Sequence, residues 1–358
     1  MLPPVSSAAA TSAPWSATHA PCPEPVIRTV DVSCPACGAS EHELVCIGRE
    51  HEYDNTTDEP FPVVRCAGCG LLRLNPRPDV SELATIYPPD YYAYDLAGAE
   101  SATSGRPGVG RLVQQLKLRL YQRRLRSVLR RAALGAGTVR LLDVGCADGR
   151  LLDWYKAGAE GRRVETYGVD MNEHAVEMAR ARGHRVVLGR FEDERELEPG
   201  TFDLILASHV IEHVADPRGF AAHAYDLLAP GGLFVVATPN VDSVEVRRFG
   251  RNWGGYHFPR HWTLYDAATI RRLGESVGFR VERVEYQANP IFWVWSLHSW
   301  LRERFPRSRV ADRLFPPVGI FRPSVQTFVL LSFFTVVDTV LRAVTGRTGS
   351  MAVDLRKP

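Results

Sequence analysis

The first 30 residues lack lysine and arginine before Arg28 and show no apolar run behind a basic start. A secretory signal needs both features, so we expect a cytoplasmic protein in a reducing compartment, where stable disulfides rarely persist. The Pro-, Ala- and Ser-rich composition of residues 1–30 predicts a disordered tail instead.

A strong net charge is absent as well. The 358 residues include 43 basic and 41 acidic side chains, which give a formal charge of +2. The net charge is therefore too small to indicate nucleic acid or another polyanion as a partner. Internal repeats are also missing, and a 45% share of hydrophobic residues is ordinary for one large domain plus a small one.

Four of the seven cysteines form two CxxC pairs, namely Cys34, Cys37, Cys66 and Cys69. In a reducing compartment this pattern favours a tetrahedral zinc ribbon over a disulfide framework. Gly38 and Gly70 each follow the second cysteine of a pair, where the chain must turn back. Because the four thiolates imply no open ligand position, we expect a structural Zn²⁺ within residues 31–78, with 42–65 as a hairpin. Redox cysteines would need a βαβ context that this segment lacks.

Residues 79–135 read as a connector. Ser81 to Tyr87 predict a short helix, and residues 97–110 predict a flexible linker. Residues 111–131 then hold eight basic side chains and no acidic one, with an apolar stripe at helical spacing. Such a helix can bind an anionic membrane or nucleic acid, but we favour a solvated helix that leans on the next domain.

From residue 139 onward, apolar strand-like segments alternate with helix-like segments. This alternation predicts a mostly parallel sheet covered on both faces, that is, a doubly wound α/β fold. The final segment, SMAVDLRKP, reads as a seventh strand that pairs with the sixth. We therefore assign residues 136–288 plus 349–358 to this domain and residues 289–348 to a helical insertion before the last strand.

The stretch LLDVGCADG places Asp143 at the end of the first strand, followed by Gly145, Ala147 and Gly149. Small residues at alternate positions let the backbone approach a ligand at the start of a helix. A dinucleotide fingerprint spaces its glycines differently and has no acid there, so this loop suits a positively charged ligand without a pyrophosphate. The second strand ends in Asp170, whose carboxylate can take both hydroxyls of a ribose.

These residues resemble the class I S-adenosylmethionine (SAM)-dependent methyltransferases, as do the later segments FDLILASHVIEHVADP and LLAPGGLFVVATPN. The resemblance implies a Rossmann-like fold with SAM as cofactor. It places Asp143, Gly145 and Gly149 against the methionine part of SAM and Asp170 on its ribose. The full expected set, with Phe191 or Glu192 flanking the adenine, is Asp143, Gly145, Cys146, Ala147, Gly149, Asp170, Met171, Phe191, Glu192 and Ser208.

The N-terminal segment CPACG…VRCAGCGLLRLNPRP resembles bacterial members of this family that carry a zinc-binding module. Some of those, such as the deoxysugar C-methyltransferases, act on nucleotide-bound sugars. By this resemblance we expect a SAM-dependent methyltransferase whose ribbon closes over the pocket and whose small-molecule acceptor is a sugar or a lipid-linked glycan precursor.

Two alternatives stay open. One is a membrane-associated quinone or lipid methyltransferase. The other is a nucleic-acid-binding protein that uses the ribbon and the 111–131 helix beside a vestigial cofactor site. The intact Asp143 and Asp170 argue against the second alternative, so we expect no nucleic-acid partner.

Candidate catalytic residues follow the fourth and fifth strands. His209, Glu212 and His213 would share one face of a helix, at a spacing that suits a metal ion. Ubiquinone-biosynthesis O-methyltransferases resemble this stretch but carry a carboxylate at the position of His209, so we favour hydrogen bonding by Glu212 and His213 over metal binding. The aromatic loop 253–262 adds His257 and His261; either can serve as a general base, and packing of the rings beneath the loop is an equal alternative.

The insertion 289–348 contains two strongly apolar stretches, 290–301 and 325–344. The second could span about 30 Å as a helix, but Gln326, Asp338 and Arg342 interrupt it, so we predict an amphipathic helix rather than a transmembrane one. Because the sixth strand is parallel to the others, the insertion emerges beside the cofactor. We favour a lid over the pocket, with peripheral membrane contact as the alternative.

Overall fold

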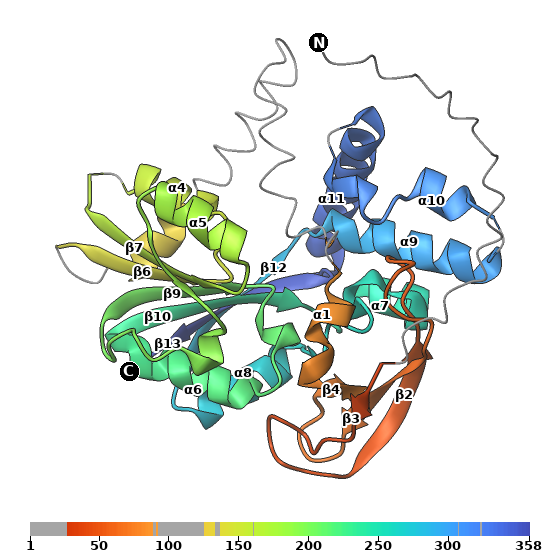
Figure 1. Cartoon of the computed structure of the whole chain (residues 1–358), viewed down its shortest axis with the longest axis horizontal. Helices are drawn as coiled ribbons and strands as arrows, with labels where there is room; N and C mark the ends of the chain where they lie inside the picture. Colours follow the sequence, from red (N-terminus) through yellow and green to blue (C-terminus); the bar gives the residue numbers. More distant parts are fainter. Residues whose placement is uncertain are drawn as a thin grey trace, which may run out of the picture.

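The computed structural model describes residues 27–88, 91, 125–132, 137–159, 161–306, 308–322 and 324–358. Most of the predicted tail 1–30, the predicted linker 97–110 and the first part of the predicted basic helix 111–131 lie outside these residues. Figure 1 shows a large sheet with helices on both faces, a small N-terminal module beside it, and a group of C-terminal helices.

The large sheet has seven strands in the order β12-β13-β10-β9-β6-β7-β8. Five neighbouring strands run parallel, while β13 lies antiparallel between β10 and β12. This confirms the predicted doubly wound α/β fold and the pairing of the last strand with the sixth. The strands are β6 (Val139–Val144), β7 (Val164–Asp170), β8 (Arg185–Leu188), β9 (Phe202–Ser208), β10 (Leu228–Pro239), β12 (Arg280–Gln287) and β13 (Ser350–Arg356).

Helices cover both faces of this sheet because its strands alternate apolar residues between two cores. Leu142 and Ile205 point into one core, and their neighbours Leu141 and Leu204 point into the other. The first core is closed by α6 (Pro217–Leu227) and α8 (Ala267–Ser276). The second is closed by α4 (Arg150–Ala157), α5 (Glu173–Ala181) and the helical residues 125–132.

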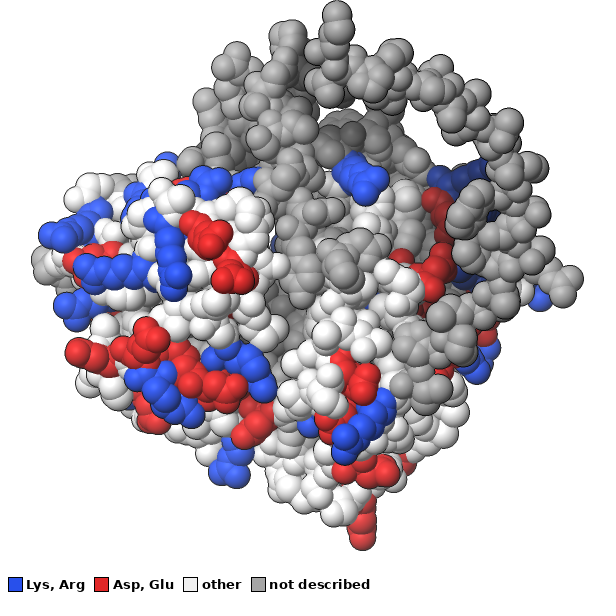
Figure 2. Space-filling view, in the orientation of Figure 1, with Lys and Arg blue, Asp and Glu red and all other residues white. Residues whose placement is uncertain are grey.

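The described end of the predicted basic helix packs as the favoured interpretation expects. Leu125 and Leu129 are buried in the second core, so this part of the helix leans on the sheet domain. On the face shown in Figure 2, basic and acidic side chains are interspersed over the sheet domain, in keeping with the low net charge.

The N-terminal module contains the predicted hairpin, formed by β2 (His42–Gly48) and β3 (Phe61–Cys66). Its sheet continues through β4 (Leu72–Leu74) to β11 (Thr263–Leu264), a strand from the segment that joins β10 and β12 of the large sheet. The remaining elements are β1 (Thr29–Val30), β5 (Arg77–Pro78), η1 (Val80–Glu82) and α1 (Leu83–Ile86). The module therefore shares a sheet with the large domain and is not a separate unit.

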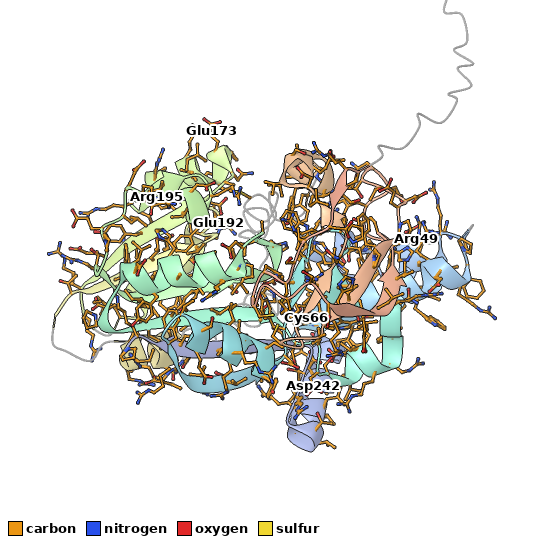
Figure 3. The ribbon with its side chains drawn as sticks, turned by 90° about the horizontal axis from the view of Figure 1, so that it is seen from below. Arg49, Cys66, Glu173, Glu192, Arg195 and Asp242 are labelled. Atoms are coloured by element: carbon orange, nitrogen blue, oxygen red, sulfur yellow. The ribbon has the colours of Figure 1, made fainter. Side chains whose placement is uncertain are left out.

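The helical insertion follows β12, as predicted. It consists of α9 (Pro290–Arg304), α10 (Val310–Leu314), η6 (Gly319–Phe321) and α11 (Val325–Thr345). Phe292 and Trp295 of α9 are buried in the same core as Phe61 and Leu74 of the N-terminal module. One core thus joins the insertion, the module and the loop that precedes β11, and Figure 3 shows the module beside the sheet domain, with Cys66 on the former and Glu192 on the latter.

Candidate active site

The carboxyl ends of the parallel strands β6, β7 and β9 meet at one edge of the sheet, where such folds bind ligands. The loop after β6 turns sharply, because Gly145 and Gly149 have φ of 74° and 79°. A Cβ at Gly145 would lie 2.9 Å from Val210 Cγ2, so only glycine fits there. The loop thereby forms a tight turn, the cradle, beside the strand ends.

Asp170 is held by this loop. Its carboxylate accepts hydrogen bonds from the backbone N–H of Ala147, at 2.8 Å, and of Asn172, at 2.9 Å. An ionised carboxylate can accept about four hydrogen bonds, so roughly two places remain for the two hydroxyls of a ribose. Met171 follows directly and is 56% exposed, which leaves an apolar surface next to the carboxylate.

Asp143 is buried at the end of β6. Burial, together with the nearby charge of Asp170, raises the pKa of Asp143 well above its usual value. A cationic ligand placed in this cradle would lower that pKa and stabilise the carboxylate. The residues at the strand ends therefore fit a ligand that carries both a ribose and a positive charge, as SAM does.

Two members of the expected cofactor set turn their side chains into the core. Cys146 is buried, and its Sγ lies 2.4 Å from where a Cβ on Gly168 would be. The Phe191 ring, in η2 (Phe191–Asp193), is buried against Phe220 and His223 at 5.0 and 4.7 Å. Any contact from these two residues to SAM must come from their backbones, and Glu192 remains the candidate for the adenine. The exposed Ser208 ends β9 at the same edge.

His209 and Glu212 form a hydrogen-bonded pair directly after β9. Glu212, in η3 (Ile211–His213), is buried, and its carboxylate accepts from His209 Nδ1 at 3.1 Å and from Thr238 Oγ1 at 3.0 Å. Burial acts to raise the pKa of Glu212, but the hydrogen bond from His209 and the nearby charges of His209 and His213 together outweigh it, and the pKa is lowered. Because an ionised carboxylate only accepts, Nδ1 of His209 carries the proton and Nε2 is left as a proton acceptor. The His209 side chain is 36% exposed, so an acceptor molecule can reach it.

Of the other three histidines near this pair, His257 and His261 are buried and His213 is half-buried. Burial lowers the pKa of His213 to about 4, and it lowers the pKa of His257 and His261 well below the usual value. His213 Nδ1 lies 2.7 Å from Tyr87 Oη, and His261 Nδ1 lies 2.7 Å from the carbonyl oxygen of Gly255. Each of these contacts gives one ring nitrogen a partner within the protein.

Ligand atoms of Glu212, His213 and His261 also lie within 4.8 Å of one another. A carboxylate and two neutral imidazoles are a donor set that a divalent cation accepts. Each oxygen of Glu212 also accepts one hydrogen bond, from His209 or from Thr238. Hydrogen bonding and metal binding by this cluster therefore both stay predictions.

The N-terminal module reaches this cluster through the loop between β2 and β3. Glu50 and Glu52 are buried there, where Glu50 pairs with Arg260 and Glu52 bonds to His257 Nδ1. Burial raises the pKa of Glu52 to about 8, against the opposing charge of Arg260. The second nitrogen of His257, Nε2, lies 3.2 Å from Tyr91 Oη, so both of its nitrogens have protein partners. These contacts favour packing for His257 over the role of general base.

Sequence reasoning missed Glu50 and Glu52. Their partners lie 210 and 205 positions away along the chain, so no local pattern marks them. The backbone conformation carries a separate sign of the site. In the described part of the chain, the non-glycine residues with positive φ are Ala147, His209 and His257, at 46°, 55° and 39°. Strained backbone of this kind concentrates at functional sites.

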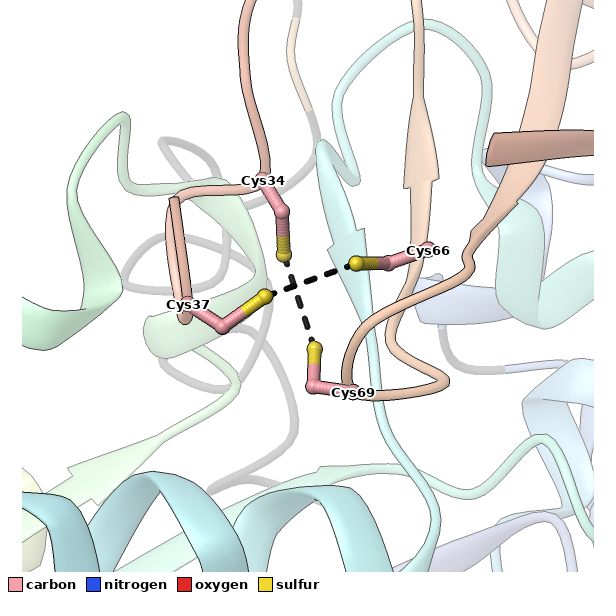
Figure 4. Close-up of side chains that lie close together, drawn as sticks. All are labelled: Cys34, Cys37, Cys66 and Cys69. Atoms are coloured by element: carbon pink, nitrogen blue, oxygen red, sulfur yellow. Dashed lines mark hydrogen bonds between the residues drawn. The ribbon is translucent and has the colours of Figure 1, made fainter. Parts of the chain in front are cut away.

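The four cysteines of the CxxC pairs come together as predicted (Figure 4). The Sγ atoms of Cys34 and Cys69 are 3.6 Å apart, and those of Cys37 and Cys66 are 3.5 Å apart. A Zn–S bond of about 2.3 Å gives a tetrahedron with edges of roughly 3.8 Å, so the cluster is compatible with Zn²⁺. Gly38 and Gly70, at φ of 79° and 80°, make the predicted turns. The bound zinc itself stays a prediction.

The thiols of the cluster differ in acidity. Burial acts to raise the pKa of Cys66, but the backbone N–H of Cys69 and the thiol of Cys37 lower it to about 7, whereas burial raises the pKa of Cys34 and Cys69. Cys66 is therefore the thiol of these three that ionises first, and the thiolate is the form that binds metals.

A family model described as a methyltransferase domain matches residues 115–284. The ubiquinone biosynthesis O-methyltransferase of Cereibacter sphaeroides is 31% identical over 181 residues, which cover 45% of this chain and 68% of that protein. The chain belongs to the SAM-dependent methyltransferases. The ubiquinone biosynthesis O-methyltransferase of Ruegeria pomeroyi is 31% identical over 179 residues, which cover 44% of this chain and 67% of that protein.

Among solved structures, a SAM-dependent methyltransferase from Archaeoglobus fulgidus is similar to this methyltransferase at a TM-score of 0.42 and 20% identity, over 67% of this chain and 94% of that one. The family model ends at residue 284, before the helical insertion, and it begins after the N-terminal module. The module and the insertion are therefore the parts in which this methyltransferase extends beyond the common domain.

Proposed function

We propose that this methyltransferase methylates a phenolic or quinol-type hydroxyl of a small molecule, with His209 as the general base. The observation that carries the proposal is the pair of a buried, ionised Glu212 and a partly exposed His209 at the carboxyl end of β9. A carboxylate that orients a histidine, and fixes which nitrogen takes a proton, is a recurring arrangement in general-base catalysis.

The cofactor side of the proposal rests on the strand ends. Asp170 would hold the ribose hydroxyls, Met171 and Glu192 would flank the adenine, and Gly145 and Asp143 would face the methionine part. When bound, SAM supplies the methyl group from its sulfonium and retains the electron pair of the broken C–S bond. The acceptor oxygen gains the methyl group, and its proton passes to Nε2 of His209.

The acidity of the acceptor supports a phenolic hydroxyl. A phenol has a pKa of about 10, whereas an alcohol-like hydroxyl is closer to water at about 15.7. A histidine, with an ordinary pKa of about 6.5, accepts the proton of a phenol far more readily. The names of the relatives, which are ubiquinone biosynthesis O-methyltransferases, also support a quinone-related acceptor. They give no support to the sugar or glycan acceptor expected from the N-terminal module.

The test offers the enzyme SAM together with either a short-chain catechol or quinol, or a nucleotide sugar, and measures formation of S-adenosylhomocysteine and of the methylated product. We expect methylation of the phenolic hydroxyl only. His209→Ala should lower kcat by about 10²–10⁴ while SAM binding stays unchanged, and added imidazole should restore part of the rate. His42→Ala, which removes an exposed histidine from β2, is the matched control and should keep full activity.

Two results would overturn the proposal. Turnover of the sugar without the phenol would remove the acceptor class, and a His209→Ala enzyme with wild-type kcat would remove the base. Loss of SAM binding in His209→Ala would assign the residue a structural role instead.

A further inference from the structure

Helix α11 exposes a long face without charge. Only 17% of its most apolar 18-residue window is buried, so α11 is not the core helix of the protein. Between Val325 and Leu341 the exposed positions carry apolar, Ser, Thr or Gln side chains and no charged one. The large apolar side chains on this face are Val325, Phe328, Val329, Phe333, Val336, Val340 and Val344. Figure 1 shows α11 standing out from the body beside α9.

Three threonine hydroxyl groups on α11 do not require water. Thr335, Thr339 and Thr345 each donate to the backbone carbonyl oxygen four residues earlier, at 2.6, 2.7 and 2.8 Å. This bond satisfies the hydroxyl within the helix, as is needed where the surroundings offer no hydrogen-bond partner. The exposed face is thus compatible with hydrocarbon between Val325 and Leu341, a stretch of 17 residues that is about 25 Å long as a helix.

The opposite face of α11 is tied to the body. Asp338 is buried and accepts hydrogen bonds from Trp293 Nε1 and from the backbone N–H of Asn289, both at 2.8 Å. The ring of Phe334 stacks on Trp293 with centroids 5.6 Å apart. Because one face is held by protein, α11 is placed to lie on a surface rather than to cross a membrane.

The charge of the insertion favours an anionic surface. Residues 289–348 contain eight arginines and three acidic residues, a net charge of +5, whereas the whole chain has +2. The exposed Arg322 stands before α11 and the exposed Arg342 lies in its last turn, so a basic group flanks the uncharged face at each end, while Arg347 beyond it is paired with Asp242. An apolar helix face with flanking arginines is the pattern of helices that lie in the interface of an anionic membrane.

We propose that the exposed face of α11 docks this methyltransferase on an anionic membrane surface, in the plane of the headgroups. Helix α9 packs on the opposite, held face of α11 and links the docked helix to the proposed base, because the ring centroids of Phe292 and His209 lie 6.1 Å apart. The docking itself does not depend on the acceptor, because it uses neither SAM nor His209.

The test is sedimentation of the full-length protein with vesicles of phosphatidylcholine alone or mixed with phosphatidylglycerol, in the absence of SAM and acceptor. We expect binding to the anionic vesicles and weaker binding to the neutral ones. The double variant Phe333→Glu/Val336→Glu should lower the partition coefficient by roughly tenfold or more, because each charge would have to enter the interface. The control Leu44→Glu/Ile47→Glu adds the same charges to exposed apolar positions of β2 and should bind as the wild type does.

Hydrogen exchange of the wild-type protein gives a second readout that needs no substitution. Added anionic vesicles should slow exchange within 325–345 and leave β2 unchanged. A folded wild-type protein that stays in the supernatant would overturn the proposal. So would a dimer that Phe333→Glu dissociates, because a second copy would then cover α11. A His209→Ala protein that still binds vesicles would keep the docking even if the proposed acceptor is wrong.

Discussion

Replacing Asp170 with alanine should weaken SAM binding by a factor of about 10²–10⁴. The Asp170 carboxylate accepts from the backbone N–H of Ala147 and Asn172, and its remaining capacity matches the two ribose hydroxyls. A hydrogen bond to a charged group contributes about 1.5–3 kcal/mol, so two such bonds contribute about 3–6 kcal/mol. Each 1.4 kcal/mol is a factor of ten in the dissociation constant.

Calorimetric titration of the zinc-loaded protein with SAM measures this loss directly. Asp203→Ala is a matched control, because the Asp203 carboxylate also accepts a backbone N–H, that of Arg140 at 2.8 Å, but at the amino end of β9. The control should bind SAM normally. If Asp170→Ala binds SAM within about threefold of the wild type, Asp170 only braces the glycine loop and the assignment of the ribose site is refuted.

Two further predictions concern the N-terminal module. The pKa of Glu52 is raised by burial from 4.5 to about 8, so the folded protein keeps this proton where the unfolded chain has lost it. The contribution of Glu52 to stability is therefore greatest below about pH 4.5 and falls as pH rises toward 8, by up to about 1.4 kcal/mol per pH unit relative to Glu52→Gln. Urea unfolding of both proteins at pH 6 and pH 8 tests this, and a pH-independent difference would mean that Glu52 is ionised throughout. Cys66→Ser should abolish a zinc content of one ion per chain, measured by mass spectrometry of the metal, and lower the unfolding temperature. Cys46→Ser, at a cysteine outside the cluster, should leave both unchanged.

Much of the fold could be predicted because its signals are local. The alternation of strands and helices, the glycine loop after β6 and the two CxxC turns each depend on residues close together in the sequence. The parts that could not be predicted depend on long-range pairing. The two residues of β11 join the sheet of the module through β4, and Arg260 is neutralised by Glu50 from the loop between β2 and β3. The residue pattern of β11, or of the loop that contains Arg260, does not indicate which distant residues it will contact.

The same limit applies to the active site. The residue types at the strand ends predicted a cofactor edge, and His209 was among the candidate bases. Burial separated the candidates afterwards, because His257 and His261 are enclosed by protein while His209 is partly exposed. Side-chain direction likewise placed Cys146 and Phe191 in the core. Which of several neighbouring residues faces solvent depends on the packing of distant segments, and this is not readable from spacing.

The shared sheet of the N-terminal module constrains how this enzyme could be recombined with others. A ribbon transplanted from a related protein would have to pair with β11 and supply an acid to Arg260, which is fully buried. Leaving that guanidinium without its carboxylate would cost about 3–5 kcal/mol. A chimera would therefore have to carry residues 257–264 together with the ribbon, and the unit of exchange in this protein is discontinuous in the sequence although it is one body in space.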